Sequence, residues 1–206
     1  MTPDSVEQLF TRRDGSYLCA RWGRPIVPVV FGVDAATLSV VKGAIEAVVV
    51  LAGHKMAETD AELAANLMVF FFRDWAELPE VPNLEKLVPD LGPLCARLEA
   101  AGANQYRGFR FDDAGAIKAA FVFLRMDAAL AAMPAEDLAL AQAAQVILLW
   151  SDRAFAGTSP LALVGEDVIL RPEIAGVIRA AYGVAMPMVA RDASHALRIA
   201  ARITDA

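Results

Sequence analysis

The chain has 206 residues, of which 57% are apolar and 21% charged, and its formal net charge is −6. This length and apolar content suit one soluble globular domain and exclude a disordered protein. The negative charge argues against a nucleic-acid partner, whose phosphates attract clustered Lys and Arg. No apolar run approaches the ~20 residues that span a bilayer, so we expect no transmembrane segment.

The amino-terminal residues 1–15 form an N-terminal extension without the apolar stretch of a signal peptide. Two locations stay open: the cytoplasm, or an exported location reached with a signal that has been removed. The only two cysteines, Cys19 and Cys95, could form one disulfide. We favour two free, partly buried thiols, because an isolated Cys commonly behaves as a small hydrophobic residue.

The first half of the chain predicts a strand, a crossover helix and a second strand. The β-rich segment 17–32 contains Pro25 and Pro28, which cannot donate ladder hydrogen bonds, so it should lie near a sheet edge or carry a bulge. Asp34 can cap a helix that ends at Gly53. The apolar run 66–72 then predicts a strand covered on both faces and parallel to the first.

The next segments predict short helices and a hairpin. Four prolines between residues 74 and 93 indicate loops and short helical pieces, followed by one short helix. Residues 105–111 and 117–126 are joined by Asp-Asp-Ala-Gly, which is typical of a hairpin turn. Pro134 opens a long helix that we expect to continue to about Trp150.

The carboxyl-terminal part is predicted to be a loop followed by helices at 173–182 and 190–203. The chain is therefore interpreted as one domain, residues 1–206, of the α+β class. Residues 17–150 form a mixed, twisted sheet with two long helices, and residues 151–206 form the mainly helical part.

Two stretches, LALAQAAQVILLWSD at 138–152 and LRPEIAGVIRAAYGVAMPMV at 170–189, resemble a bacterial family, domain-of-unknown-function family 2927, related to metzincin-type zincins. Gln145 and Asp152 match the family pattern in the first stretch. Arg179, Tyr182 and Pro187 match it in the second, and RWGRPI at 21–26 is similar to the family's opening strand. The resemblance implies a zincin-like, metallopeptidase-like fold for most of the chain, and export in usual members.

The ligands of a zinc peptidase are missing. Such a site needs three protein ligands, usually with two His at i and i+4 of a helix and a Glu that acts as base. The resemblance places Ala141, Gln142 and Gln145 at these positions, and Leu148 and Ser151 at the positions that complete a metzincin pattern. Ala and Leu have no donor atoms, and Gln lacks the basic carboxylate. We therefore predict no metal, no cofactor and no zinc peptidase activity.

The two histidines lie far apart in the sequence. His54 follows the carboxyl end of the first long helix, where a surface histidine is common. His195 lies among arginines on the last amphipathic helix, so we expect it on the solvated face. Motifs of serine hydrolases, phosphate loops, dinucleotide-binding folds and Cys-x-x-Cys redox sites are absent from the sequence.

Polar side chains near the long helix define a candidate cleft. The two glutamines either face the sheet, where buried amides need partners, or point to solvent. The carboxylates either meet in the cleft or lie on a charged, solvated loop. The candidate residues are Gln142, Gln145, Asp152, Glu166, Asp167 and Tyr182.

Three functions remain open. The first is a non-catalytic, zincin-like protein that keeps its cleft as a binding or structural surface. The second is a hydrolase that uses the carboxylates of the cleft, which strongly shifted carboxyl pKa values would support. The third is an interaction module whose apolar surface is covered by a protein or peptide partner or by a second copy of the chain.

Overall fold

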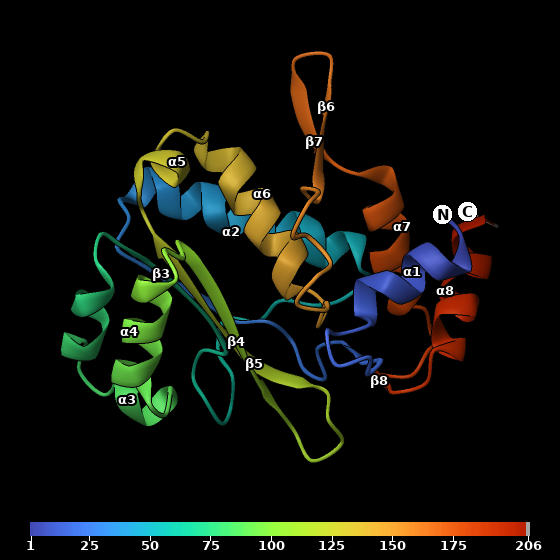
Figure 1. Ribbon diagram of the computed structural model, residues 1–206, viewed down its shortest axis with the longest axis horizontal. Helices are drawn as coiled ribbons and strands as arrows, with labels where there is room; N and C mark the ends of the chain where they lie inside the picture. The colour runs from blue at the N-terminus through green and yellow to red at the C-terminus, as the bar shows by residue number, and fades with distance from the viewer. Residues whose placement is uncertain (205–206) are drawn as a thin grey trace.

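A mixed sheet forms the centre of the computed structural model, which describes residues 1–204 apart from the side chain of Thr204 (Figure 1). The strand order is β2-β3-β5-β4. The first three strands are parallel to one another, and β4 runs antiparallel to β5 at the edge. Their bounds are β2 Pro28–Phe31, β3 Leu67–Phe72, β4 Gln105–Phe111 and β5 Ile117–Arg125.

Helices cover both faces of this sheet (Figure 1). On one face, α2 (Ala35–Leu51) and α6 (Ala135–Val146) pack against the sheet within the main core. On the other, η1 (Trp75–Glu80), α3 (Leu84–Leu87) and α4 (Leu91–Ala100) enclose a second core around Phe121 and Phe123. The predicted α+β class with a mixed sheet is therefore confirmed, and β3 is covered on both faces as predicted.

The β2-α2-β3 unit follows the local signals of the sequence. The Asp34 carboxylate accepts a hydrogen bond from the Thr37 N–H at 2.8 Å and caps α2. Gly53, with φ of +65°, ends the helix in the left-handed conformation that glycine adopts without steric cost. Pro28 opens β2 at the sheet edge, as predicted.

The predicted strand over residues 17–32 is interrupted. Only β1 (Cys19–Ala20) and β2 form ladders, and between them Trp22 and Ile26 form isolated bridges to other segments. Pro25 contributes no N–H, and Trp22 bridges to β5 while Ile26 bridges to Met56. The segment therefore crosses from one sheet to another instead of running along one.

The long helix α6 ends at Val146 and not near Trp150, so the predicted boundary was wrong. Distant side chains occupy the carbonyls that a longer helix would use. The Trp22 indole N–H donates to the Val146 oxygen and the Tyr182 hydroxyl donates to the Ile147 oxygen, both at 2.8 Å. Beyond Val146 the chain extends, and the Leu149 N–H donates to the Ala20 oxygen.

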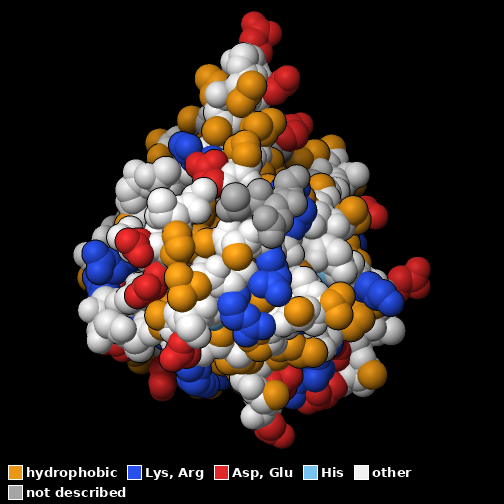
Figure 2. Space-filling model, turned by 90° about the vertical axis from the view of Figure 1, so that its right-hand side faces the viewer, with side chains coloured by type: hydrophobic (Ala, Val, Ile, Leu, Met, Phe, Trp, Pro, Cys, Tyr) orange, Lys and Arg blue, Asp and Glu red, His pale blue; other side chains and the backbone are white. Residues whose placement is uncertain are grey.

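The carboxyl-terminal part contains strands as well as helices. A hairpin of β6 (Leu161–Val164) and β7 (Asp167–Leu170), joined by Gly165 and Glu166, occupies the predicted loop. It projects from the molecule at the top of Figure 1, and Figure 2 shows the same projection in space-filling form. The remaining elements are α5 (Ala128–Ala131), α7 (Pro172–Ala181), β8 (Val189–Ala190), which pairs with β1, and α8 (Ser194–Thr204).

The amino-terminal segment is not a simple extension. It forms α1 (Pro3–Phe10), whose Val6 and Phe10 are fully buried and which packs beside α8 (Figure 1). His195, on α8, is buried in this region, so its predicted place on a solvated face was wrong. The Tyr17 side chain lies against His195, with the two ring centroids 6.0 Å apart, and α1 packs against the same helix.

Both cysteines are free, as predicted, and both are buried. Cys19 belongs to the main core and Cys95 to the second core on the opposite face of the sheet. In the described part of the chain, no helix has the length and apolar content needed to cross a membrane.

Candidate binding cleft along strand β4

The outer edge of β4 is open. The Arg125 N–H donates to the Asn104 oxygen, and the Ala120 N–H points away from β4 to the Asn66 oxygen, both at 2.8 Å. Because hydrogen-bonded and non-hydrogen-bonded pairs alternate in an antiparallel ladder, the backbone groups of Gln105, Arg107 and Phe109 face outward. Within residues 1–204, these outward N–H and C=O groups have no hydrogen-bond partner.

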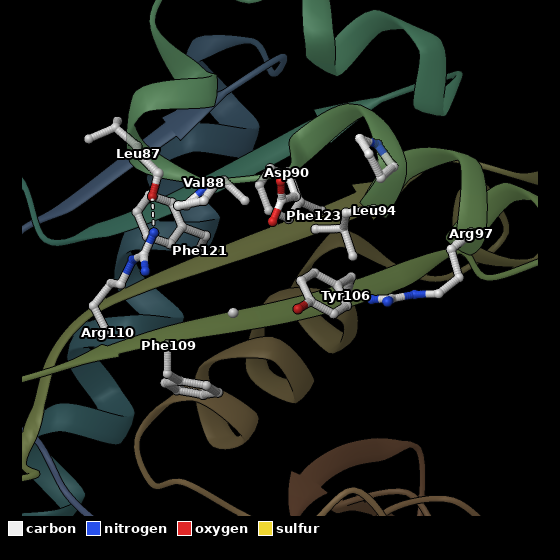
Figure 3. A pocket seen from close by; sticks show the side chains of 13 residues that line it. Leu87, Val88, Asp90, Leu94, Arg97, Tyr106, Phe109, Arg110, Phe121 and Phe123 are labelled. Carbon is white, nitrogen blue, oxygen red and sulfur yellow. Dashed lines mark hydrogen bonds between the residues drawn. The ribbon is translucent and has the colours of Figure 1, made fainter.

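A pocket lies on each side of β4. On the side of α6, a pocket of about 590 Å³, here called the arginine pocket, is lined by Arg12, Arg13, Arg107, Phe109, Trp150 and Asp152. On the opposite side, a pocket of about 580 Å³, here called the aromatic pocket, is lined by Leu94, Arg97, Tyr106, Arg110, Phe121 and Phe123 (Figure 3). Both volumes are in the range of small-ligand sites.

The arginine pocket contains a cation, Arg107, that has no carboxylate partner within residues 1–204. Arg107 donates to Gln142 Oε1 at 2.7 Å and to Gln105 Oε1 at 3.3 Å, and Gln142 Nε2 donates to Gln105 Oε1 at 2.8 Å. Burial lowers the pKa of Arg107 to about 10, so the guanidinium stays charged at neutral pH. Two neutral amides therefore hold a positive charge at the wall of an open pocket.

The mouth of this pocket carries charges of both signs. Arg13 Nε lies 3.1 Å from Asp152 Oδ2, and both side chains are largely exposed. Arg12 forms no salt bridge with any described residue, and Asp14 also lines the pocket. Asp152 is paired with Arg13, and Arg12 interacts electrostatically with Asp14, so the three arginines and two carboxylates of the pocket leave one net positive charge to attract an anionic group.

The aromatic pocket is floored by the sheet. Figure 3 shows Tyr106 and Arg97 along one side, and Arg110 bonded to the Leu87 oxygen on another. The Arg110 Nη2–O distance is 2.7 Å. Gly108 places no side chain into this space, and a Cβ there would meet only Tyr106 at 3.6 Å. The pocket therefore offers mixed surroundings to a side chain that points in from the β4 edge, with apolar Val88 and Tyr106 beside charged Asp90, Arg97 and Arg110.

The structure separates the six candidate residues. Gln142 faces the sheet, whereas Gln145 is half-buried and donates to the Ala141 oxygen of its own helix at 3.1 Å, so the two amides do not bond each other. Asp152 lies at the arginine pocket. Glu166 and Asp167 lie exposed at the hairpin tip, so of the two alternatives for these carboxylates the charged, solvated segment agrees with the structure and a cluster with Asp152 does not.

Tyr182 lies in the core and not in the cleft. Its hydroxyl holds the Ile147 oxygen, and its ring is 5.3 Å from the His54 ring. The Arg21 guanidinium lies over the same ring at 5.3 Å. His54 itself is half-buried and its Nε2 lies 2.8 Å from the Arg24 oxygen, so it is not a free surface histidine.

No metal site is formed within residues 1–204, since no three His, Cys, Asp or Glu side chains lie close enough to hold one ion. Leu148 and Ser151 lie beyond the end of α6, out of register with Ala141, Gln142 and Gln145.

The partners of Gln142, Gln105 and Arg107, were not predicted from the sequence. The one signal was their alternation on β4, which places two polar side chains on the face that meets α6.

Comparisons of this chain with protein-family models, curated proteins and solved structures found no match. The structure alone defines the class of the protein, which is an α+β domain with a mixed sheet whose edge strand β4 is open among the described residues.

The buried amide at position 142 gives a test of this arrangement. We expect Gln142→Leu to lower the free energy of unfolding by roughly 2 kcal/mol, because it removes the closest acceptor of a charged, partly buried donor. Gln145→Leu is the matched control on the same helix, with an expected change within about 0.5 kcal/mol. Urea unfolding of the two variants measures the difference, and equal losses would contradict the buried network.

Proposed function

We propose that this protein is a non-catalytic, zincin-like binding domain that takes an extended, acidic peptide segment along the open edge of β4. The observation that carries the proposal is the unpaired edge of β4 with a pocket on each side. An added strand gains affinity from backbone hydrogen bonds and specificity from pockets that accept alternate side chains.

The geometry of a strand matches this arrangement. Successive side chains of an added strand point to opposite faces of the sheet. One row would enter the arginine pocket, where Arg12 and Arg107 favour carboxylates. The other row would enter the aromatic pocket, where the half-buried side chains of Val88 and Tyr106 favour apolar groups. A peptide that alternates acidic and apolar residues therefore fits both.

The order of elements supports the zincin-like part of the proposal. A strand, a helix and a strand are followed by the β4–β5 hairpin and the long helix α6, which is the order implied by the resemblance to family 2927. The β6–β7 hairpin departs from the mainly helical carboxyl part that we expected. The carboxylate hydrolase has no such support, because Asp152 is apart from Glu166 and Asp167.

Peptide binding tests the proposal. We expect a fluorescent peptide of alternating Glu and Leu to bind in an anisotropy titration, and the matching Lys and Leu peptide to bind at least about tenfold more weakly. Arg12→Glu should reduce this preference, since it reverses one charge of the pocket.

A pair of variants isolates the backbone contribution. Phe109→Pro removes an outward N–H and should weaken binding at least about tenfold relative to Phe109→Ala, which keeps that N–H. Failure of both peptides to bind, or equal affinities of the two Phe109 variants, would overturn the proposal.

A further inference from the structure

The β6–β7 hairpin exposes an apolar surface. Leu163, Val164 and Ile169 have exposed fractions of 69%, 57% and 36%. Within the described residues each strand of the hairpin pairs only with the other, so both outer edges are open. Open strand edges with apolar side chains are surfaces for pairing with another chain.

The tip of this hairpin is acidic. Residues 161–170 include Glu166 and Asp167 and no Lys or Arg. Both carboxylates are exposed, and in the part of the chain that the structure describes neither forms a salt bridge. Figure 2 shows red acidic atoms at the end of the projection and orange apolar side chains along it. The hairpin thus combines the two properties that suit the β4 cleft.

The β6–β7 hairpin cannot reach the β4 cleft of its own molecule. The turn has only two residues, and the hairpin points away from β4 (Figure 1). A second copy of the chain carries the same cleft, whose three arginines exceed its two carboxylates by one positive charge, with Phe109 and Trp150 as apolar neighbours. Charge and apolar character are therefore complementary between the hairpin of one copy and the cleft of another.

We infer that the β6–β7 hairpin of one molecule docks along the β4 edge of a second copy, with Glu166 and Asp167 at the arginine pocket. This inference rests on the proposed function and names the partner of that site. The added strand satisfies the outward backbone groups of Arg107 and Phe109, and Leu163, Val164 and Ile169 become covered. The contact joins two different surfaces, so each molecule carries one donor hairpin and one acceptor edge.

Sedimentation velocity across micromolar to millimolar concentrations tests this contact. We expect the wild-type chain to form a dimer or larger assembly, and Leu163→Lys to weaken self-association at least about tenfold. Val184→Lys is the matched control, because Val184 is likewise an exposed apolar residue but lies outside the hairpin and the cleft. A wild-type chain that stays monomeric, or a Leu163→Lys chain that associates normally, would overturn the inference.

Complementation identifies which surfaces meet. Leu163→Lys damages the hairpin and Phe109→Pro damages the acceptor edge, so each variant alone should be monomeric. Mixed together, they retain one intact hairpin and one intact edge, and a one-to-one complex should form. If the mixture stays monomeric while wild type associates, the hairpin does not dock on β4.

A synthetic peptide of residues 160–171 separates this inference from the proposed function. The Leu163→Lys chain keeps its cleft and should bind both this peptide and the alternating Glu and Leu peptide. Binding of the alternating peptide alone would overturn self-docking and leave the proposed function intact. Loss of both would refute the proposed function itself.

Discussion

Gly32→Ala should lower the free energy of unfolding by roughly 3–5 kcal/mol. Gly32 follows β2 with φ of +82°, a conformation that residues with a Cβ rarely adopt. A Cβ at this position would lie 2.0 Å from the Phe71 carbonyl oxygen. That oxygen belongs to the backbone of β3, which is held between β2 and β5, so it cannot rotate away as a side chain would.

Gly15→Ala is the control for this variant. Gly15 has nearly the same φ, +83°, but no atom lies within 4 Å of an added Cβ. Its substitution should cost only the local backbone strain, about 1–2 kcal/mol. Urea unfolding of both variants gives the comparison, and similar losses would show that the approach of β3 to Gly32 is not the cause.

A second large effect is expected from His195 as the pH falls. The side chain is 3% exposed, and its Nδ1 lies 2.8 Å from the Tyr17 hydroxyl. Its buried Nε2 has no hydrogen-bond partner among the described residues. Burial, together with the positive charges of Arg198, Arg202 and Arg21, lowers the pKa of His195 to about 4.

This lowered pKa makes folding stability depend on pH. In the unfolded chain His195 takes up a proton as the pH falls below about 6.5, whereas the folded chain keeps the ring neutral until about pH 4. The stabilising contribution is therefore complete above pH 6.5 and is lost as the pH falls towards 4. The difference in pKa corresponds to about 3 kcal/mol.

Thermal and urea unfolding between pH 7 and pH 4 measure this loss. His195→Gln does not titrate, so its stability should fall by about 3 kcal/mol less than that of wild type over the same interval. His54→Gln is the comparison, because burial also lowers the pKa of the other histidine, His54. A His195→Gln chain with an unchanged pH dependence would refute the assignment.

Some features of this fold are set by residues that are adjacent in the sequence, and such features could be predicted from the sequence. The Asp34 cap and the turn at Gly53 need only residues within one helical turn, and they bound α2 as predicted. Pro28 lacks an N–H wherever it lies, so its place at the sheet edge followed from its own chemistry. The apolar run 66–72 likewise required cover on both faces.

The predictions that were wrong concern residues whose contacts lie far away in the sequence. The carbonyls at the end of α6 are taken by Trp22 and Tyr182, so the helix stops a full turn earlier than its composition suggests. His195 is buried by packing near α1 and by Tyr17, which is 178 residues away. An amphipathic pattern on one helix does not show which other element covers it.

The sequence by itself determined the α+β class, the parallel β2-α2-β3 unit and the edge position of β2. Only the tertiary structure decided that Gln142 meets Arg107 of β4, that Glu166 and Asp167 lie on a projecting hairpin, and that the outer edge of β4 is open. The physical reason is that caps, turns and missing donor atoms are properties of a residue and its neighbours. Strand order and the partners of a buried amide depend on the whole chain's packing.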